Sequence, residues 1–202
     1  YREPPHYITL GKELPAKALD EILTDHAEVF TELKEYYKQT SESDTTKISF
    51  YEDTYSLYNL YRFAHYYEEA YGKYIWLKSG ASLVIEHTEA MTVIDVNTGS
   101  VLKKKKQEDT LFYQINREAA KEIARQLRLR NISGIIMIDF INMKDTAQKE
   151  KLLSLLDSEC KKDRVHCNVI DMTALNLVEM TRSKVRKPLH EQIRSCMKNN
   201  RS

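Results

Sequence analysis

Two carboxylates, each close to the C-terminal end of an apolar run, are the residues whose types and spacing could do chemistry. The runs are AMTVIDVNTG (90–99) and GIIMIDF (134–140), which contain Asp95 and Asp139. An ionised carboxylate in apolar surroundings is costly unless it is paired, hydrogen-bonded or bound to metal. In α/β sheets, ligands collect at the C-terminal ends of the strands. If the two runs form neighbouring strands, both acids therefore meet at one edge of a sheet.

A pair of hard oxygen ligands suits Mg²⁺, which keeps several waters and takes further contacts from a substrate phosphate. Such an ion polarises a phosphate, stabilises developing negative charge and lowers the pKa of an attacking water. Asn97 follows Asp95 by two residues and so points to the same side of an extended strand, where its amide can orient the carboxylate. Spacing alone favours the structural alternative, in which both acids are helix N-caps or strand-end groups in salt bridges.

The elements around these acids alternate in type along the second half of the chain. Strands are expected at 90–96, 134–141 and 165–170, and amphipathic helices at 108–130 and 146–161 lie between them. This alternation predicts a sheet with crossover helices, preceded by a hairpin of strands 74–77 and 81–86. The expected fold class is therefore α/β, with a mixed sheet.

The first part of the chain is richer in tyrosine and charge. Helical spacing predicts helices at 16–23 and 31–37, and short strands are expected at 26–30 and 47–51. A further helix is predicted over 57–71, with an aromatic stripe. Its members are Tyr58, Tyr61, Phe63, His65 and Tyr66. Aromatic residues can stack on unpaired bases, but helical spacing favours packing against the protein.

Composition limits the class of protein. The 202 residues are 42% hydrophobic, enough for one large or two small domains, and the net charge of +1 does not by itself indicate a nucleic-acid binder. Cys160, Cys167 and Cys196 form no C-x-x-C pair, which favours a reducing cytoplasmic location without a zinc cage. The sequence contains no apolar run of about 18 residues and no signal-peptide pattern, so no intrinsic membrane segment is expected.

Local basic clusters are candidates for contacts with nucleic-acid phosphates. They are Lys103, Lys104, Lys105 and Lys106 after the first acid; Arg125, Arg128 and Arg130 at a helix end; and Arg182, Lys184, Arg186 and Lys187. Each cluster has a structural alternative, as a solvated loop or tail or as cations that favour the helix dipole. His87 is expected to be a surface or packing residue, and no cysteine has a histidine partner at a catalytic spacing.

A long, colinear resemblance adds to these observations. The segments TEAMTVIDVNTG (88–99) and INREAAKEIARQLRLRNISGIIMIDFINM (115–143) resemble the catalytic stretch of the RNase E/G family of bacterial endoribonucleases. WLKSGASLVIEHTEA (76–90) and VEMTRSKVRKPL (178–189) extend the similarity over most of 73–190. It implies that Asp95 and Asp139 hold Mg²⁺ and that Asn97 orients Asp95.

The same resemblance implies a domain organisation. Residues 74–190 are expected to form a DNase I-like catalytic subdomain, and residues 1–73 part of a smaller α+β RNase H-like subdomain. Residues 191–202 are expected to be a C-terminal tail. The family's OB-fold domain and 5′-monophosphate pocket are not recognisable in this sequence. We therefore expect the chain to be a fragment, or a shortened relative, of a larger nuclease.

The implied activity is Mg²⁺-dependent internal cleavage of single-stranded RNA in RNA processing or decay. Asn142 replaces the family's second acid in the I-D-F-I-D-M segment, and Cys196 alone stands where the family has C-P-x-C. Because that motif links two subunits through zinc, we expect no zinc link from this chain and a homo-oligomer only in the full-length protein. The alternatives are a non-catalytic RNA-binding or assembly fragment that needs the missing domains, and a metal-dependent DNase.

Overall fold

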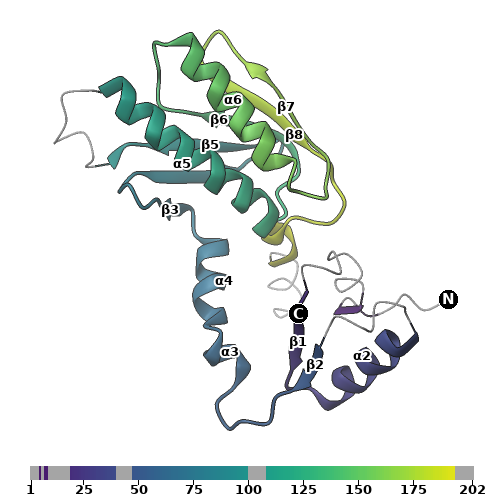
Figure 1. Cartoon of the computed structure of the whole chain (residues 1–202). Helices are drawn as coiled ribbons and strands as arrows, with labels where there is room; N and C mark the ends of the chain where they lie inside the picture. Colours follow the sequence, from purple (N-terminus) through teal and green to yellow (C-terminus); the bar gives the residue numbers. More distant parts are fainter. Residues whose placement is uncertain (1–4, 6, 9–18, 40–46, 100–107, 194–202) are drawn as a thin grey trace. The chain divides into compact units, whose positions relative to one another are not determined.

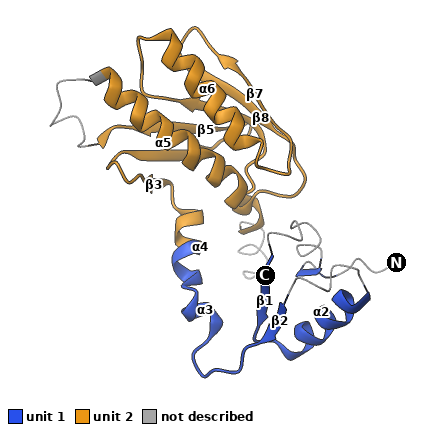
Figure 2. Cartoon of the chain, in the orientation of Figure 1, with its two compact units in different colours: residues 1–66 blue, residues 67–202 orange. Residues whose placement is uncertain are grey.

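The computed structural model describes residues 5, 7–8, 19–39, 47–99 and 108–193. The chain divides into two compact units, residues 1–66 and residues 67–202 (Figure 2). The division falls within one helix. Both carboxylates of interest belong to the larger unit.

The smaller unit is built on a pair of parallel strands. β1 (Glu21–Thr24) pairs with β2 (Lys47–Phe50), and α2 (Ala27–Gln39) packs beside them. Two expectations are wrong here: the described end of the predicted helix 16–23 is a strand, and the predicted strand 26–30 lies in α2 from residue 27 onward. The strand forms because Ile22 pairs with Ile48, a contact that the local helical spacing of apolar residues does not reveal.

The predicted helix 57–71 is two helices. α3 (Leu57–Leu60) begins at Ser56, whose hydroxyl accepts a hydrogen bond from the Asn59 backbone, and α4 (Phe63–Tyr71) follows. Arg62 lies between them with a φ of 52°, a left-handed conformation that a helix cannot continue through.

The aromatic stripe of these helices is exposed, so the expectation that it packs is wrong. Tyr58 is 49%, Tyr61 52%, Phe63 43% and Tyr66 52% exposed. Helical spacing shows that apolar residues share a side of a helix, but it does not show that another element covers that side. Among the described residues of this unit, by contrast, Ile8, Leu33 and Tyr37 form a buried hydrophobic cluster.

The larger unit contains a six-stranded mixed sheet in the order β3-β4-β5-β6-β8-β7. Its strands are β3 (Tyr74–Trp76), β4 (Ser82–His87), β5 (Met91–Asn97), β6 (Gly134–Asp139), β7 (Cys167–Met172) and β8 (Leu177–Arg182). Only β5 and β6 are parallel neighbours; the other adjacent pairs are antiparallel. The α/β class, the mixed sheet and the predicted hairpin are confirmed.

Within this sheet, β8 is the strand that the sequence did not predict. It lies between β6 and β7, so the connection through α6 (Thr146–Cys160) passes over it. Its alternating burial, with Val178, Met180 and Arg182 buried, is a strand pattern in a segment rich in charged and polar residues.

One face of this sheet is covered by helices. α5 (Glu108–Leu129) and α6 lie side by side across it (Figure 1). Ile115, Ala119, Ile123 and Leu127 recur every four residues along α5, and all are at most 1% exposed. They pack with Ile94, Ile136 and Ile138 of the sheet, and with Leu152 and Leu156 of α6. We call the opposite side, formed by the alternate strand residues that point away from these helices, the open face.

No helix in the described ranges is long and apolar enough to cross a membrane.

Candidate active site: a carboxylate pair on the open face

The parallel pair of strands brings Asp95 and Asp139 together. They are register partners across β5 and β6, and Asp139 is the last residue of its strand. Directly opposed residues of neighbouring strands project to the same side of a sheet, with backbones about 4.8 Å apart. Ile94 and Ile138, the preceding residues, are completely buried under the helices. The two carboxylates therefore lie on the open face, Asp95 half-buried and Asp139 exposed.

Asn97 lies on the same face and contacts the first acid. Its Nδ2 donates a hydrogen bond to Oδ2 of Asp95 at 2.6 Å. This contact fixes one oxygen of Asp95 and leaves Oδ1 to take another partner. The structure thus brings together the three residues that the sequence singled out.

The electrostatics of the pair favour a cation. Partial desolvation, and after it the negative charge of Asp95, raise the pKa of Asp139. Among the salt bridges between described residues, none includes either acid. Nor do the described residues contain a group of three or more His, Cys, Asp or Glu side chains with metal-binding geometry. Two carboxylates with room for further ligands fit Mg²⁺, which retains waters, better than a closed zinc site.

Asn116 is a buried polar residue near the carboxylate pair that sequence reasoning missed. It is completely buried in α5; its Nδ2 donates to the Ile141 carbonyl at 2.8 Å, and its Oδ1 accepts from the Ile141 amide at 3.0 Å. The bond pair clamps the backbone two residues beyond Asp139. An asparagine on the apolar face of an amphipathic helix was the available signal, because a buried amide must find partners.

The end of β5 is held against the turn that joins β3 to β4. Gly99 has a φ of +57°, and a Cβ there would lie 2.7 Å from the carbonyl oxygen of Gly80. Glu118 of α5 accepts hydrogen bonds from the backbone amides of Lys78 at 2.7 Å and Ser79 at 3.3 Å. The close approach of the Gly99 and Gly80 backbones and the carboxylate of Glu118 therefore hold the turn beside the end of β5.

Of the predicted RNA-binding cations, two lie inside the protein. Arg130 and Arg182 are each 4% exposed. Arg130 donates to Gln126 and to the Glu69 carbonyl, and Arg182 donates to Asp163, Asn131 and the Ile132 carbonyl. Both guanidinium groups donate hydrogen bonds inside the protein, so the prediction that they contact RNA phosphates is wrong.

The other predicted cations either lie on the surface of the protein or fall outside the residues that the structure describes. Arg125 forms ion pairs with Glu69 and Glu122 and is partly exposed. Arg128 is exposed, and Lys184 is exposed with Glu191 as a partner at 3.7 Å. The four lysines 103–106 lie outside the described residues.

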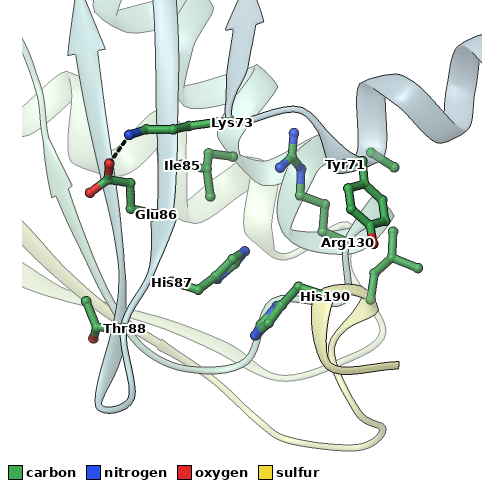
Figure 3. A pocket seen from close by; sticks show the side chains of 10 residues that line it. Tyr71, Lys73, Ile85, Glu86, His87, Thr88, Arg130 and His190 are labelled. Carbon is green, nitrogen blue, oxygen red and sulfur yellow. Dashed lines mark ion pairs between the residues drawn. The ribbon is translucent and has the colours of Figure 1, made fainter. Parts of the chain in front are cut away.

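A cavity of about 350 Å³ lies at the other end of the β4–β5 pair (Figure 3). The rings of His87 and His190 stack at its wall, with centroids 3.9 Å apart, and His87 Nδ1 lies 3.0 Å from Thr92 Oγ1. Thr92 is near the start of β5, whereas Asp95 is near its end. His87 is thus a packing residue, as predicted, and belongs to a different place on the sheet from the carboxylates.

Comparison with known proteins identifies the family. Residues 1–185 match the Ribonuclease E/G family, to which the chain belongs. It is 37% identical over 189 residues to Ribonuclease G of Haemophilus influenzae, covering 94% of this chain and 38% of that protein. It is similar to Ribonuclease G of Escherichia coli K12, with 38% identity over 85% of this chain and 35% of the relative.

Ribonuclease E of Nostoc is a further relative, 34% identical over 86% of this chain and 26% of its own length. The chain thus spans less than two fifths of each of these relatives.

Proposed function

We propose that this chain carries the metal-dependent catalytic site of an endoribonuclease acting on single-stranded RNA. The observation that carries the proposal is the pairing of Asp95 with Asp139 on parallel strands, on a face that the described helices leave open. Membership of the Ribonuclease E/G family supports RNA as the substrate class.

The residues have separate roles in this proposal. Asp95 and Asp139 hold Mg²⁺ through carboxylate oxygens, and Asn97 keeps Asp95 in a fixed orientation through its 2.6 Å hydrogen bond. Asn116 sets the backbone beyond Asp139 by clamping Ile141. A bound Mg²⁺ supplies Lewis-acid stabilisation of the phosphate and a lowered pKa for water.

The test is internal cleavage of a single-stranded, 5′-monophosphorylated RNA in Mg²⁺ or in EDTA. We expect cleavage by the wild type in Mg²⁺ alone, and none by Asp95→Asn or Asp139→Asn. Glu89→Gln is the matched control, because it removes an exposed carboxylate just before the start of β5, away from Asp95. Mg²⁺ binding, measured by calorimetry, should disappear in the same two variants and persist in the control.

The outcomes separate the alternatives. Metal binding that depends on Asp139, without cleavage, would identify a fragment that needs the remainder of its longer relatives for activity. Equal cleavage of DNA of the same sequence would point to a less selective nuclease. Cleavage that survives both aspartate substitutions would refute the assigned site.

A further inference from the structure

The edge strand β3 presents two large aromatic side chains to solvent. Tyr74 is 59% and Trp76 73% exposed, whereas Ile75 between them is 6% exposed and joins the core. The alternation of a strand therefore places Tyr74 and Trp76 on the open face, roughly 7 Å apart along the strand. Tryptophan is highly buried on average, and exposed aromatics on a sheet edge favour unwanted association. Two of them together indicate a binding surface.

Strand register places this pair beside the carboxylate site. One cross-strand row runs from Tyr74 through Val84 and Asp95 to Asp139. The next row runs from Trp76 through Ser82 to Asn97. The aromatic pair therefore lies on the same face as Asp95 and Asn97, two strand spacings or about 10 Å away.

The backbone that carries Trp76 is held in place. Leu77 donates to the carbonyl of Ala81 at 2.9 Å, which closes the hairpin, and the Glu118 carboxylate accepts from the amides of Lys78 and Ser79. A ligand that stacks on Trp76 consequently pays little to order the strand beneath it.

Positive charge lies next to the aromatic pair rather than on the carboxylate rows. A groove of about 430 Å³ is lined by Trp76, by Lys78 from the turn, and by Lys121 and Arg128 from α5, together with Arg125 and three glutamates. Glu69 and Glu122 are paired with Arg125, and Glu118 accepts from the amides of Lys78 and Ser79. Lys78, Lys121 and Arg128 are exposed. The groove lies at the sheet edge on the α5 side, so a strand that crosses this edge at Trp76 would bring its phosphates to the cations there. The open face near Asp95 and Asp139 repels phosphates in the absence of a cation.

We propose that Tyr74 and Trp76 form a stacking platform for unpaired bases of the RNA strand that passes the Asp95–Asp139 site. The neighbouring phosphates lie in the groove beside Lys78, Lys121 and Arg128. The identity of the ligand as RNA rests on the proposed function. The platform favours single strands, because a base can stack on a protein side chain only when it is unpaired. Every base has a π-face, so the platform distinguishes single-stranded from double-stranded RNA but does not read sequence.

Trp76 provides the assay, because it is the only tryptophan in the chain. We would titrate the chain in EDTA with a short oligouridylate, and with an abasic oligomer that has the same phosphates but no bases. The expected result is saturable quenching of tryptophan fluorescence by oligouridylate alone. Equal quenching by the abasic oligomer, or no binding of oligouridylate, would overturn the platform.

Variants then separate stacking from charge. By anisotropy of a labelled oligouridylate, Trp76→Ala should bind roughly 5- to 100-fold more weakly, and Trp76→Phe should recover most of the affinity. Ile170→Ala, on the opposite edge strand and 55% exposed, is the control and should bind like the wild type. Circular dichroism should show all three folded, because each altered side chain is exposed. Unchanged affinity in Trp76→Ala would refute the proposal.

The same set of proteins distinguishes this inference from the proposed function. Asp95→Asn should lose cleavage but keep the base-dependent quenching. If Asp95-dependent cleavage occurs while Trp76→Ala binds RNA normally, the platform is wrong and the catalytic assignment stands. If quenching occurs in a chain that neither cleaves nor binds Mg²⁺, the platform stands and the catalytic assignment is wrong.

Discussion

Replacing Asp139 by asparagine should stabilise the metal-free protein while it abolishes metal binding. The charge of Asp95 contributes to the raised pKa of Asp139, so the two ionised groups repel each other in the folded state. For charges about 6 Å apart at an effective dielectric constant of about 40 to 80, the repulsion is about 0.7 to 1.4 kcal/mol. Because Asp139 is exposed, we expect Asp139→Asn to raise the free energy of unfolding by about 1 kcal/mol at neutral pH in EDTA.

Magnesium should remove the greater stability that Asp139→Asn has over the wild type in EDTA. At a free concentration roughly ten times the dissociation constant, a ligand that binds only the folded state stabilises it by about 1.4 kcal/mol. The wild type should gain this amount and Asp139→Asn nothing, so the two proteins should reach similar stability in Mg²⁺.

The sign of the pH dependence follows from the direction of the pKa shift. The pKa of Asp139 is raised in the folded state above its ordinary value of 3.8, so the folded protein binds this proton more tightly than the unfolded chain does. The destabilising repulsion is therefore fully present above the raised pKa and is lost as pH falls through it. The difference between wild type and variant should shrink at acid pH.

Urea unfolding at neutral and acid pH, in EDTA and in Mg²⁺, measures each of these quantities. Glu89→Gln controls for the loss of one negative charge elsewhere, because Glu89 lies in the turn between β4 and β5. If Asp139→Asn were less stable than the wild type in EDTA, or if Mg²⁺ stabilised both proteins equally, the carboxylates would not form the repelling metal site described here.

Three further predictions concern the scaffold of the site. Asp163→Asn leaves the buried guanidinium of Arg182 without its carboxylate, so urea unfolding should show a loss of about 3 to 5 kcal/mol; a loss below about 1 kcal/mol would show that water reaches the pair. Gly99→Ala meets both a positive φ and a backbone oxygen at 2.7 Å, and should cost about 1 to 3 kcal/mol together with weaker Mg²⁺ binding; unchanged stability would exclude the close packing. Cys167 should react with iodoacetamide before Cys160, since a hydrogen bond from Cys160 lowers the pKa of the Cys167 thiol, whereas that bond and burial raise the pKa of Cys160. Peptide mapping by mass spectrometry gives the order, and equal rates would contradict it.

The local pattern of apolar residues was sufficient to predict the long elements. The i, i+4 recurrence of apolar residues along α5 predicted a helix over 108–130, and the structure has it at Glu108–Leu129. The apolar runs around Asp95 and Asp139 likewise predicted β5 and β6 to within two residues at either end. Short elements failed, because β1 is a strand only through its pairing with β2, far along the chain.

Contacts between distant residues explain the rest of what the sequence did not reveal. Arg130 and Arg182 are of a residue type that usually lies on the surface. In this protein their guanidinium groups donate hydrogen bonds to Gln126, Asp163 and backbone carbonyls in the core. Tyr58 and Tyr66 have the spacing of packing residues and are exposed. In each case the residue type is local information, whereas the partner that decides its environment comes from another element.

For this protein, the sequence by itself determined the family, the α/β class and the two acids that define the candidate site, because these depend on residue types in ordered runs. The tertiary structure decided that Asp95 and Asp139 are register partners and that Trp76 lies on the same open face. It also decided that Asn116 of α5 forms hydrogen bonds with the backbone just beyond the end of β6. Strand order and register are properties of pairing between segments far apart in the chain. No single segment contains the hydrogen bonds that fix them.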